Sequence, residues 1–310
     1  MLSRRNIRVK VMQTLYSIDL MHSEIKPGEA ASILNKNLEH SKQLFTYLVY
    51  LITEIALFSE IEAAQKAQKH LPSVHDLNVN TKIAGNELVN TVLNNVSFKK
   101  AIKDYNIEAL TDKEFVRKIY HSLAATPEYK EYITAQNRDN RSEKKILEYI
   151  FSTMLLPSED FISEMEEKFI HWDDDVDMMI VMMANFLQKP PAFNFDEMLT
   201  KEKEDFAKNL LACVIDKKEY CLELIKPKLK NWDADRIAAL DMIFMRMGVC
   251  EFLFFETIPP KVTINEYIDL AKEYSTPQSG HFVNGILDNI HKELLAENKI
   301  HKKKFKNSTL

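Results

Sequence analysis

Glycine is scarce in this sequence of 310 residues. The chain contains five glycines, whereas an average composition of about 7% would supply roughly twenty. Hairpin turns and phosphate-binding loops depend on glycine, because it enters the region of positive φ without steric cost. The shortage therefore argues against a strand-rich fold and favours helices.

The motifs of nucleotide-binding and hydrolytic enzymes are also missing. The sequence contains no GxGxxG, GxxxxGK[ST] or GxSxG segment. Aspartates gather between residues 173 and 177, but they precede an apolar helix, where the helix dipole favours carboxylates. Glu167 and His171 lie one helical turn apart with no further ligand in the sequence, which is typical of a solvated helix face. We therefore expect no enzyme, no metal and no cofactor.

Cysteines and long apolar runs are few. Cys213, Cys221 and Cys250 form no CxxC pair and lie among apolar residues, a pattern typical of reduced core thiols in a cytosolic protein. The N-terminus lacks an apolar signal core, and the apolar run over residues 178–187 contains Asn185 and is too short to span a membrane. These features predict a cytoplasmic protein without membrane contact.

The charge balance restricts any nucleic-acid site. The formal net charge is −5, so the protein as a whole does not attract polyanions, and RNA binding would require a local basic patch. Hydrophobic residues make up 45% of the chain, and its length allows two domains with a substantial core.

Apolar residues recur at helical spacing in the first third of the chain. Residues 4–22 form one such segment with Ser3 as N-cap, and Pro27-Gly28 ends it. Residues 30–69 predict long amphipathic helices, whereas residues 74–85 are polar and turn-like. Helical patterns resume at Glu87 and break near Thr126-Pro127.

The segment Lys189-Pro190-Pro191 marks a boundary, beyond which the helical pattern is strong. It covers residues 200–226, 233–255, 264–274 and 280–296. Thr263 and Glu266 have the spacing of a capping box for the third of these helices. The lysine-rich residues 299–310 predict a disordered tail. The fold class is therefore all-α.

The N-terminal helix has a basic start. Arg5, Arg8 and Tyr16 fall within an arc of roughly 80° at about 100° per residue, and Arg4 precedes them. Guanidinium groups bind phosphates in a bidentate manner, and a tyrosine ring can stack on an unpaired base. An ordinary basic helix end has the same composition, so the pattern alone leaves both interpretations open.

Several segments resemble the NusB family of bacterial antitermination factors. Residues 4–16, with Arg4, Arg5, Arg8 and Tyr16, resemble the family's RRxxR…QxLY opening. Residues 258–266 are similar to its PxKVAINEA segment, and residues 279–288 to SxKFVNGVLD. Weaker similarities to YFxxLL and LRxAxYEL lie at residues 205–211 and around residues 246–251.

The resemblance implies an all-α, NusB-like helical bundle without catalytic activity. It implies boxA-type single-stranded RNA of ribosomal RNA leaders as ligand, the small-subunit ribosomal protein NusE as partner, and a place in the RNA polymerase elongation complex. The residues implied on the RNA side are Arg4, Arg5, Arg8, Tyr16, Gln278, Ser279, His281, Phe282 and Asn284. Those implied in partner binding are Asp241, Arg246 and Glu251.

The sequence departs from the family at two of these positions. Gln278 stands where the family often has an acidic residue, which removes a charge that would repel phosphate. His281 replaces a lysine and is a weaker cation near neutral pH. A structural interpretation also remains open at two positions: Phe282 can belong to the core, and Gly285 can serve close helix packing.

The largest departure is length. The resemblance predicts residues 1–29 as the first helix of the NusB-like domain, residues 196–298 as its C-terminal part and residues 299–310 as the basic tail. Residues 30–195 form an inserted or extended helical region of unknown role, either a docking surface or a stabilising buttress. Two other functions remain: a protein–protein scaffold whose RNA site has decayed, or the NusB-like domain of a ribosomal-RNA-modifying enzyme. The last would require a glycine-rich methyl-donor domain.

Overall fold

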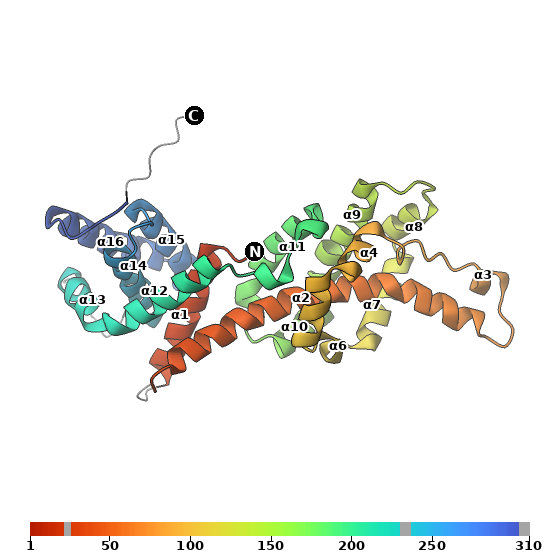
Figure 1. The fold of residues 1–310 in the computed structure, drawn as a ribbon, viewed down its shortest axis with the longest axis horizontal. Coiled ribbons are helices and arrows are strands. Elements are labelled where there is room, and N and C mark those ends of the chain that lie inside the picture. Colours follow the sequence, from red (N-terminus) through yellow and green to blue (C-terminus); the bar gives the residue numbers. More distant parts are fainter. Residues whose placement is uncertain (22–25, 230–236, 304–310) are drawn as a thin grey trace. The chain divides into compact units, whose positions relative to one another are not determined.

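The computed structural model describes residues 1–21, 26–229 and 237–303. Over these ranges the chain is helical and contains no β-strand, as the shortage of glycine predicted. The chain divides into two compact units (Figure 1). Unit 1 consists of Met1 and Glu39–Met198, and unit 2 consists of Leu2–Leu38 and Leu199–Leu310.

Unit 1 contains most of the long helix α2 (Glu29–Ala67) together with a series of shorter helices. These are α3 (Val74–Leu77), α4 (Glu87–Asn94), α5 (Val96–Asp104), α6 (Ile107–Leu110), α7 (Lys113–Ala125), α8 (Pro127–Thr134), α9 (Asn140–Tyr149), the π-helical turn η1 (Ile150–Leu155), α10 (Glu159–Lys168) and α11 (Trp172–Gln188), followed by the 3₁₀ turns η2 (Pro190–Ala192) and η3 (Phe195–Glu197). Ring contacts join α2 to α7 through Phe58 and Tyr120, and to α11 through Phe45 and Phe186.

The apolar stripe of α2 forms much of the core of unit 1. Leu44, Leu48, Leu51, Ile55 and Phe58 are all buried. By length and composition α2 could cross a membrane, since its most hydrophobic 18-residue window has a mean hydropathy of 1.6, yet 72% of that window is buried inside the protein. The burial of this apolar run, which was not predicted as a possible membrane span, is typical of a core helix.

Aromatic residues of α10, α11 and the neighbouring segments complete this core. Phe151, Phe161, Phe169, Trp172 and Phe186 are each at most 6% exposed, which confirms that they are core residues. Aspartates occupy the first turn of α11, as the helix dipole favours, and buried Asp175 accepts a hydrogen bond from Ser41 Oγ at 3.0 Å.

Two local predictions in unit 1 can be compared with the structure. The break at Thr126-Pro127 is confirmed, because α7 ends at Ala125 and Thr126 caps α8. The prediction of only turns over residues 74–85 was wrong at its start. Ser73 and Asp76 exchange hydrogen bonds of 2.8–3.1 Å there, which organise the one-turn helix α3.

Unit 2 is a helical bundle around one central helix. Its helices are α1 (Arg4–Leu20), α12 (Lys201–Asp216), α13 (Lys218–Ile225), the 3₁₀ turn η4 (Lys226–Lys228), α14 (Ala239–Phe254), α15 (Pro260–Tyr274) and α16 (Ser279–Ala296). The central helix is α14, which contacts α1, α12, α13, α15 and α16 and is buried continuously from Ile243 to Phe252. The first helix of the chain thus completes a bundle whose other helices come from the last third.

Two predictions for unit 2 were wrong. Helix α15 begins at Pro260 rather than beside Thr263, because proline at the first helical position already has the φ that a helix needs. Thr263 therefore lies inside the helix, where its hydroxyl donates to Glu251 Oε2 at 2.9 Å.

The second prediction concerned the disordered tail over residues 299–310, whose start is instead bound to unit 2. Lys302 Nζ donates to the carbonyl oxygens of Glu251 at 2.7 Å and Phe255 at 2.8 Å. Residues 304–310 and the start of the predicted helix 233–255 lie outside the described ranges.

Close helix packing in unit 2 depends on two glycines other than Gly285. A Cβ at Gly248 would lie 2.8 Å from Leu287 Cδ2, and a Cβ at Gly280 would lie 2.6 Å from Lys272 Cγ. At Gly285 no described atom beyond its chain neighbours and the adjacent helix backbone lies within 4 Å of such a Cβ. The interpretation of Gly285 as a packing residue is therefore wrong.

Candidate nucleic-acid interface

The basic start of α1 is held in a defined position by local and distant contacts. Ser3 and Asn6 form a capping box, in which Asn6 N donates to Ser3 Oγ at 3.2 Å and Ser3 N donates to Asn6 Oδ1 at 2.9 Å. This confirms Ser3 as the N-cap. The cap fixes the first turn, from which Arg4 and Arg5 extend toward α12 and α15.

Arg4 and Arg5 are the accessible cations of this turn. The Arg4 side chain is 41% exposed and its Nη2 lies 2.7 Å from Glu202 Oε1 of α12. The Arg5 side chain is 36% exposed and its Nη2 lies 2.7 Å from Glu273 Oε2 of α15. Both guanidinium groups are therefore half-exposed and already paired with carboxylates at the surface.

Arg8 lies inside the bundle, in contrast to its two neighbours. It is 2% exposed, and its guanidinium donates to both carboxylate oxygens of Glu251, at 2.7 and 3.1 Å, and to Glu266 at 3.2 Å. Burial would lower the pKa of Arg8, but the charge and hydrogen bonds of Glu251, with further charge from Tyr267 and Glu266, raise it above its ordinary value. The buried Arg8 has no surface to offer an RNA in this conformation.

The arc that the sequence predicted for Arg5, Arg8 and Tyr16 is thus divided by burial. Tyr16 is 37% exposed and the Arg5 side chain is 36% exposed. Arg8, which lies at one edge of the arc about 60° from Arg5, points into the core. Helical spacing fixed their direction around α1 but could not reveal that Glu251 of α14 meets Arg8.

The N-cap and first turns of α16 combine one buried serine with several exposed polar residues. Ser279 is 1% exposed, and its hydroxyl donates to Asp241 Oδ2 of α14 at 2.7 Å. Gln278, His281 and Asn284 are exposed, and Phe282 is half-buried. The Arg5–Glu273 contact joins the start of α1 to the end of α15, which leads directly into this turn.

The residues predicted to bind a protein partner lie inside unit 2. Asp241, Arg246 and Glu251 are 5%, 3% and 0% exposed. Arg246 Nη2 donates to Asp19 Oδ2 of α1 at 2.6 Å, and Tyr267 Oη donates to Glu251 Oε1 at 2.8 Å. These side chains tie α14 to its neighbours, and a partner could touch them only if the helices moved apart.

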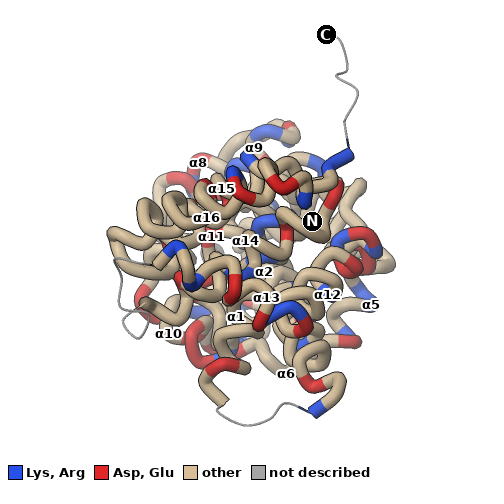
Figure 2. The backbone as a smooth tube through the Cα atoms, turned by 90° about the vertical axis from the view of Figure 1, so that its left-hand side faces the viewer, with Lys and Arg blue, Asp and Glu red and all other residues tan. Residues whose placement is uncertain are grey.

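The acidic partners of the basic start of α1 were not predicted from the sequence. Glu202 and Glu273 lie 198 and 268 residues from the arginines that they pair with, so no local pattern could indicate them. Lys and Arg are interspersed with Asp and Glu along the helices of this unit (Figure 2). Any polyanion approaching α1 therefore meets both signs of charge.

Within the residues that the structure describes, no three His, Cys, Asp or Glu side chains converge in a way that could hold a metal ion. The cysteines are free thiols, and Cys221 Sγ lies 3.6 Å from Cys250 Sγ in the core.

Comparison with known proteins identifies one matching family. The sequence profile described as the NusB family matches residues 182–292. The transcription antitermination protein NusB of Salinibacter ruber is 43% identical over 98 residues, which are 32% of this chain and 61% of that protein. Proteins of the same name from Methylacidiphilum infernorum and Desulfatibacillum aliphaticivorans are 41% and 40% identical over 70% and 73% of their lengths. No solved structure matches the chain.

The profile match begins within α11, near the end of unit 1, and continues through the helices that form unit 2 with α1. Each of these relatives aligns with about a third of this chain. The remaining residues, including nearly all of unit 1, are an additional region. On the identity and coverage of these relatives, the chain belongs to the NusB family.

Proposed function

We propose that this protein is an RNA-binding transcription antitermination factor without enzymatic activity. In this proposal it binds boxA-type single-stranded RNA together with NusE and joins the elongating RNA polymerase in the cytoplasm. The proposal extends to this chain what membership of the family and the names of its relatives suggest.

One observation carries the proposal beyond family membership. The profile match begins only at residue 182, yet α1 packs into the same unit as the matched helices. The Arg5–Glu273 contact of 2.7 Å brings its basic start beside the turn that leads into α16. This contact supports treating the two segments as one surface in the proposal.

Each exposed residue of this surface has a specific role in the proposal. Arg4 and Arg5 exchange their carboxylate partners for RNA phosphates, which guanidinium groups bind in the same geometry. Tyr16 stacks on an unpaired base. Gln278, His281 and Asn284 offer hydrogen bonds to base edges, with Phe282 beside them. Arg8 and Ser279 act as positioning residues from within the bundle.

Fluorescence anisotropy with a labelled boxA RNA and a scrambled RNA tests this proposal. We expect the wild-type protein to prefer boxA, and NusE to tighten that binding by linking two binding events. The double variant Arg4→Ala/Arg5→Ala should lose at least about tenfold in affinity, because each phosphate contact contributes salt-sensitive binding energy.

The matched control is Lys100→Ala/Arg141→Ala, which removes two exposed cations from unit 1. This variant should bind boxA as the wild type does. Equal binding of boxA and scrambled RNA, or equal losses in the two double variants, would contradict a specific RNA surface at α1.

A protein–protein scaffold without RNA is the second candidate. Its support is that both exposed arginines of α1 are already neutralised by carboxylates and that Arg8 is buried. In that case the charge pairs serve the fold, and unit 1 would carry the function.

A further inference from the structure

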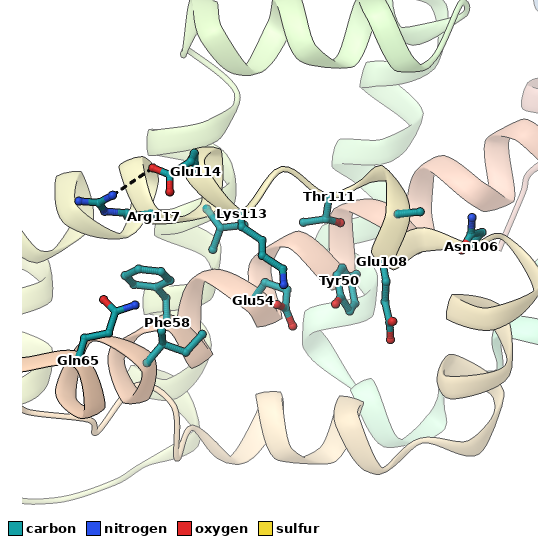
Figure 3. A pocket seen from close by; sticks show the side chains of 13 residues that line it. Tyr50, Glu54, Phe58, Gln65, Asn106, Glu108, Thr111, Lys113, Glu114 and Arg117 are labelled. Carbon is teal, nitrogen blue, oxygen red and sulfur yellow. Dashed lines mark hydrogen bonds and ion pairs between the residues drawn. The ribbon is translucent and has the colours of Figure 1, made fainter. Parts of the chain in front are cut away.

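Polar side chains already pair with one another in a groove of unit 1. This groove has a volume of about 880 Å³ and lies between α2 and residues 106–117 (Figure 3). Glu114 pairs with Arg117 there at 3.2 Å, and Tyr50 donates a hydrogen bond to Glu54. The groove therefore presents no charge of a single sign that would select a ligand. Reactive side chains that the proposed function does not use lie instead in the core of unit 2.

The three cysteines of the chain lie on neighbouring helices of unit 2. Cys213 belongs to α12, Cys221 to α13 and Cys250 to α14, and each of these helices contacts the other two. The Sγ atoms of Cys221 and Cys250 lie 3.6 Å apart, and the Cys250 thiol also interacts with the Cys213 thiol. Cys250 is thus the middle member of a set of free thiols, which we call the thiol cluster.

The contact between Cys221 and Cys250 leaves a short path to a disulfide. The two sulfurs are in van der Waals contact at 3.6 Å, so no other atom stands between them. A disulfide bond of about 2.05 Å requires them to approach by about 1.6 Å more. Both side chains are 0% exposed. The core therefore already encloses both sulfurs, and a bond between them would remove two hydrogens and add no atom.

The two buried thiols differ in how readily they lose a proton. A hydrogen bond from Cys250 lowers the pKa of Cys221, and the charge of Arg246 lowers it further, although burial opposes both effects. Hydrogen bonds to Cys213 and Cys221, together with burial, raise the pKa of Cys250. Because the thiolate is the form that attacks another sulfur, Cys221 is the nucleophile of this pair.

Cys213 is the member of the thiol cluster that solvent can reach. It is half-buried, whereas Cys221 and Cys250 are fully buried. A small oxidant that enters from solvent therefore meets Cys213 first. Metal binding does not compete for these thiols, because no three His, Cys, Asp or Glu side chains among the described residues could hold a metal ion.

From this geometry we propose that the thiol cluster is a redox site, in which hydrogen peroxide oxidises Cys213 and the oxidation ends as a disulfide between Cys221 and Cys250. In the first step the Cys213 sulfur attacks one peroxide oxygen, the O–O bond breaks, and a sulfenic acid and one water are formed. The Cys250 sulfur then attacks the sulfenic sulfur and displaces a second water, which gives a Cys213–Cys250 disulfide.

The last step transfers the disulfide into the core. The Cys221 thiolate attacks the Cys250 sulfur, the bond between Cys250 and Cys213 breaks, and Cys213 leaves as a thiolate. Cys213 then takes up the proton that Cys221 had lost. Overall, two thiols and one peroxide become one disulfide and two waters, and Cys213 is ready to react again.

The test treats the folded, full-length protein with an equimolar amount of hydrogen peroxide. The protein is then denatured, its remaining thiols are alkylated, and mass spectrometry of unreduced peptides identifies the disulfides. We expect a Cys221–Cys250 disulfide with an alkylated Cys213, and dithiothreitol should restore all three thiols. Cys213→Ala should slow disulfide formation about tenfold or more, because peroxide must then reach fully buried thiols.

Two further variants trap the intermediates. Cys221→Ala should stop the sequence at the Cys213–Cys250 disulfide, and Cys250→Ala should leave Cys213 as a sulfenic acid that dimedone labels. Alanine is chosen because a buried free cysteine packs as a small apolar residue. Helical circular dichroism shows whether each variant is folded, and the wild type with Cys213→Ala decides the outcome if a core variant is not.

Three results would overturn the proposal. The first is a wild-type protein that keeps three alkylatable thiols, or that is oxidised at Cys213 without forming a disulfide. The second is a Cys213→Ala variant that forms the Cys221–Cys250 disulfide as fast as the wild type does. The third is a dimer linked through Cys213, because this thiol would then react between chains instead of with Cys250. None of these results depends on RNA binding by unit 2.

Discussion

Buried charge in unit 2 is concentrated around Glu251. This carboxylate is 0% exposed and accepts hydrogen bonds from Arg8, Thr263 and Tyr267. The four side chains come from α1, α14 and α15, so the network joins three helices. At the scale of single residues, one of the three arginines predicted on the RNA side is instead part of this internal network.

We predict that Arg8→Ala destabilises unit 2 by about 3 kcal/mol or more, because it leaves Glu251 buried without its cation. Arg5→Ala should cost less than about 1 kcal/mol, since the Arg5–Glu273 pair is exposed to solvent. Hydrogen exchange of the α14 amides measures the stability of unit 2 directly. Similar protection of α14 in both variants would contradict the assigned role of Arg8.

Lys302 offers a second prediction at this scale. Burial lowers its pKa to about 8 from an ordinary value of 10.5, although Glu251 and Glu256 raise it in part. Between these two pH values the unfolded chain binds more protons at this residue than the folded one, so this group makes stability rise with pH there. A Lys302→Met variant should lack this increase. NMR titration of methylated lysines should show one resonance that titrates near pH 8 and disappears in the variant.

At the scale of helices, the distance to which two helices of unit 2 can approach each other depends on where glycine stands in place of a larger residue. Gly248 of α14 faces Leu287 of α16, and Gly280 faces the stem of Lys272 on α15. Gly285 faces no such neighbour and is exposed. Three glycines within the same bundle therefore have different tolerances for a methyl group.

We predict opposite effects of alanine at two of these positions. Gly248→Ala should destabilise unit 2 by about 1–3 kcal/mol, because the new Cβ would overlap the buried Leu287. Gly285→Ala should stabilise it by up to about 1 kcal/mol, since alanine is the better helix former where space is available. Thermal unfolding followed by circular dichroism distinguishes the two. Destabilisation by Gly285→Ala would indicate a contact at this position that the described residues do not make.

Helix existence was easier to predict than the contacts between helices. The apolar stripe of α2, the Ser3 cap of α1 and the break at Thr126-Pro127 are local signals, and the structure confirms them. The start of α15 was misplaced because two local signals competed, the proline at Pro260 and the capping-box spacing of Thr263 and Glu266. In the structure these two residues make tertiary contacts instead: Thr263 with Glu251, and Glu266 with Arg8. The burial of Arg8, Arg246 and Ser279 could not be predicted, since their partners lie on other helices.

At the scale of the whole molecule, the negative net charge works against RNA binding. The chain carries a formal charge of −5, and Glu202 and Glu273 place part of it beside the two accessible arginines of α1. Arg4 and Arg5 can therefore bind phosphate only in competition with these carboxylates. The net charge of the surface around α1, rather than the number of arginines on it, sets the affinity for RNA.

We predict that Glu202→Gln/Glu273→Gln raises the affinity for RNA about threefold to tenfold at low salt, because two competing surface ion pairs are removed. The advantage should shrink as salt increases. Glu60→Gln/Glu131→Gln gives the same net charge of −3, from −5 plus two, and should have a smaller effect. Equal gains in both variants would mean that overall charge, and not the local pairs, controls binding.

The division of unit 2 between the two ends of the chain has a consequence for its synthesis. Arg8 meets Glu251 only after 243 further residues have been made, which takes about 12–50 s at translation rates of 5–20 residues per second. During that time α1 is an amphipathic helix without its bundle, while the residues of unit 1 emerge and can fold. Apolar side chains of α1 that the bundle buries completely, such as Ile7 and Val11, therefore have no native partners on α14 until the last third of the chain leaves the ribosome.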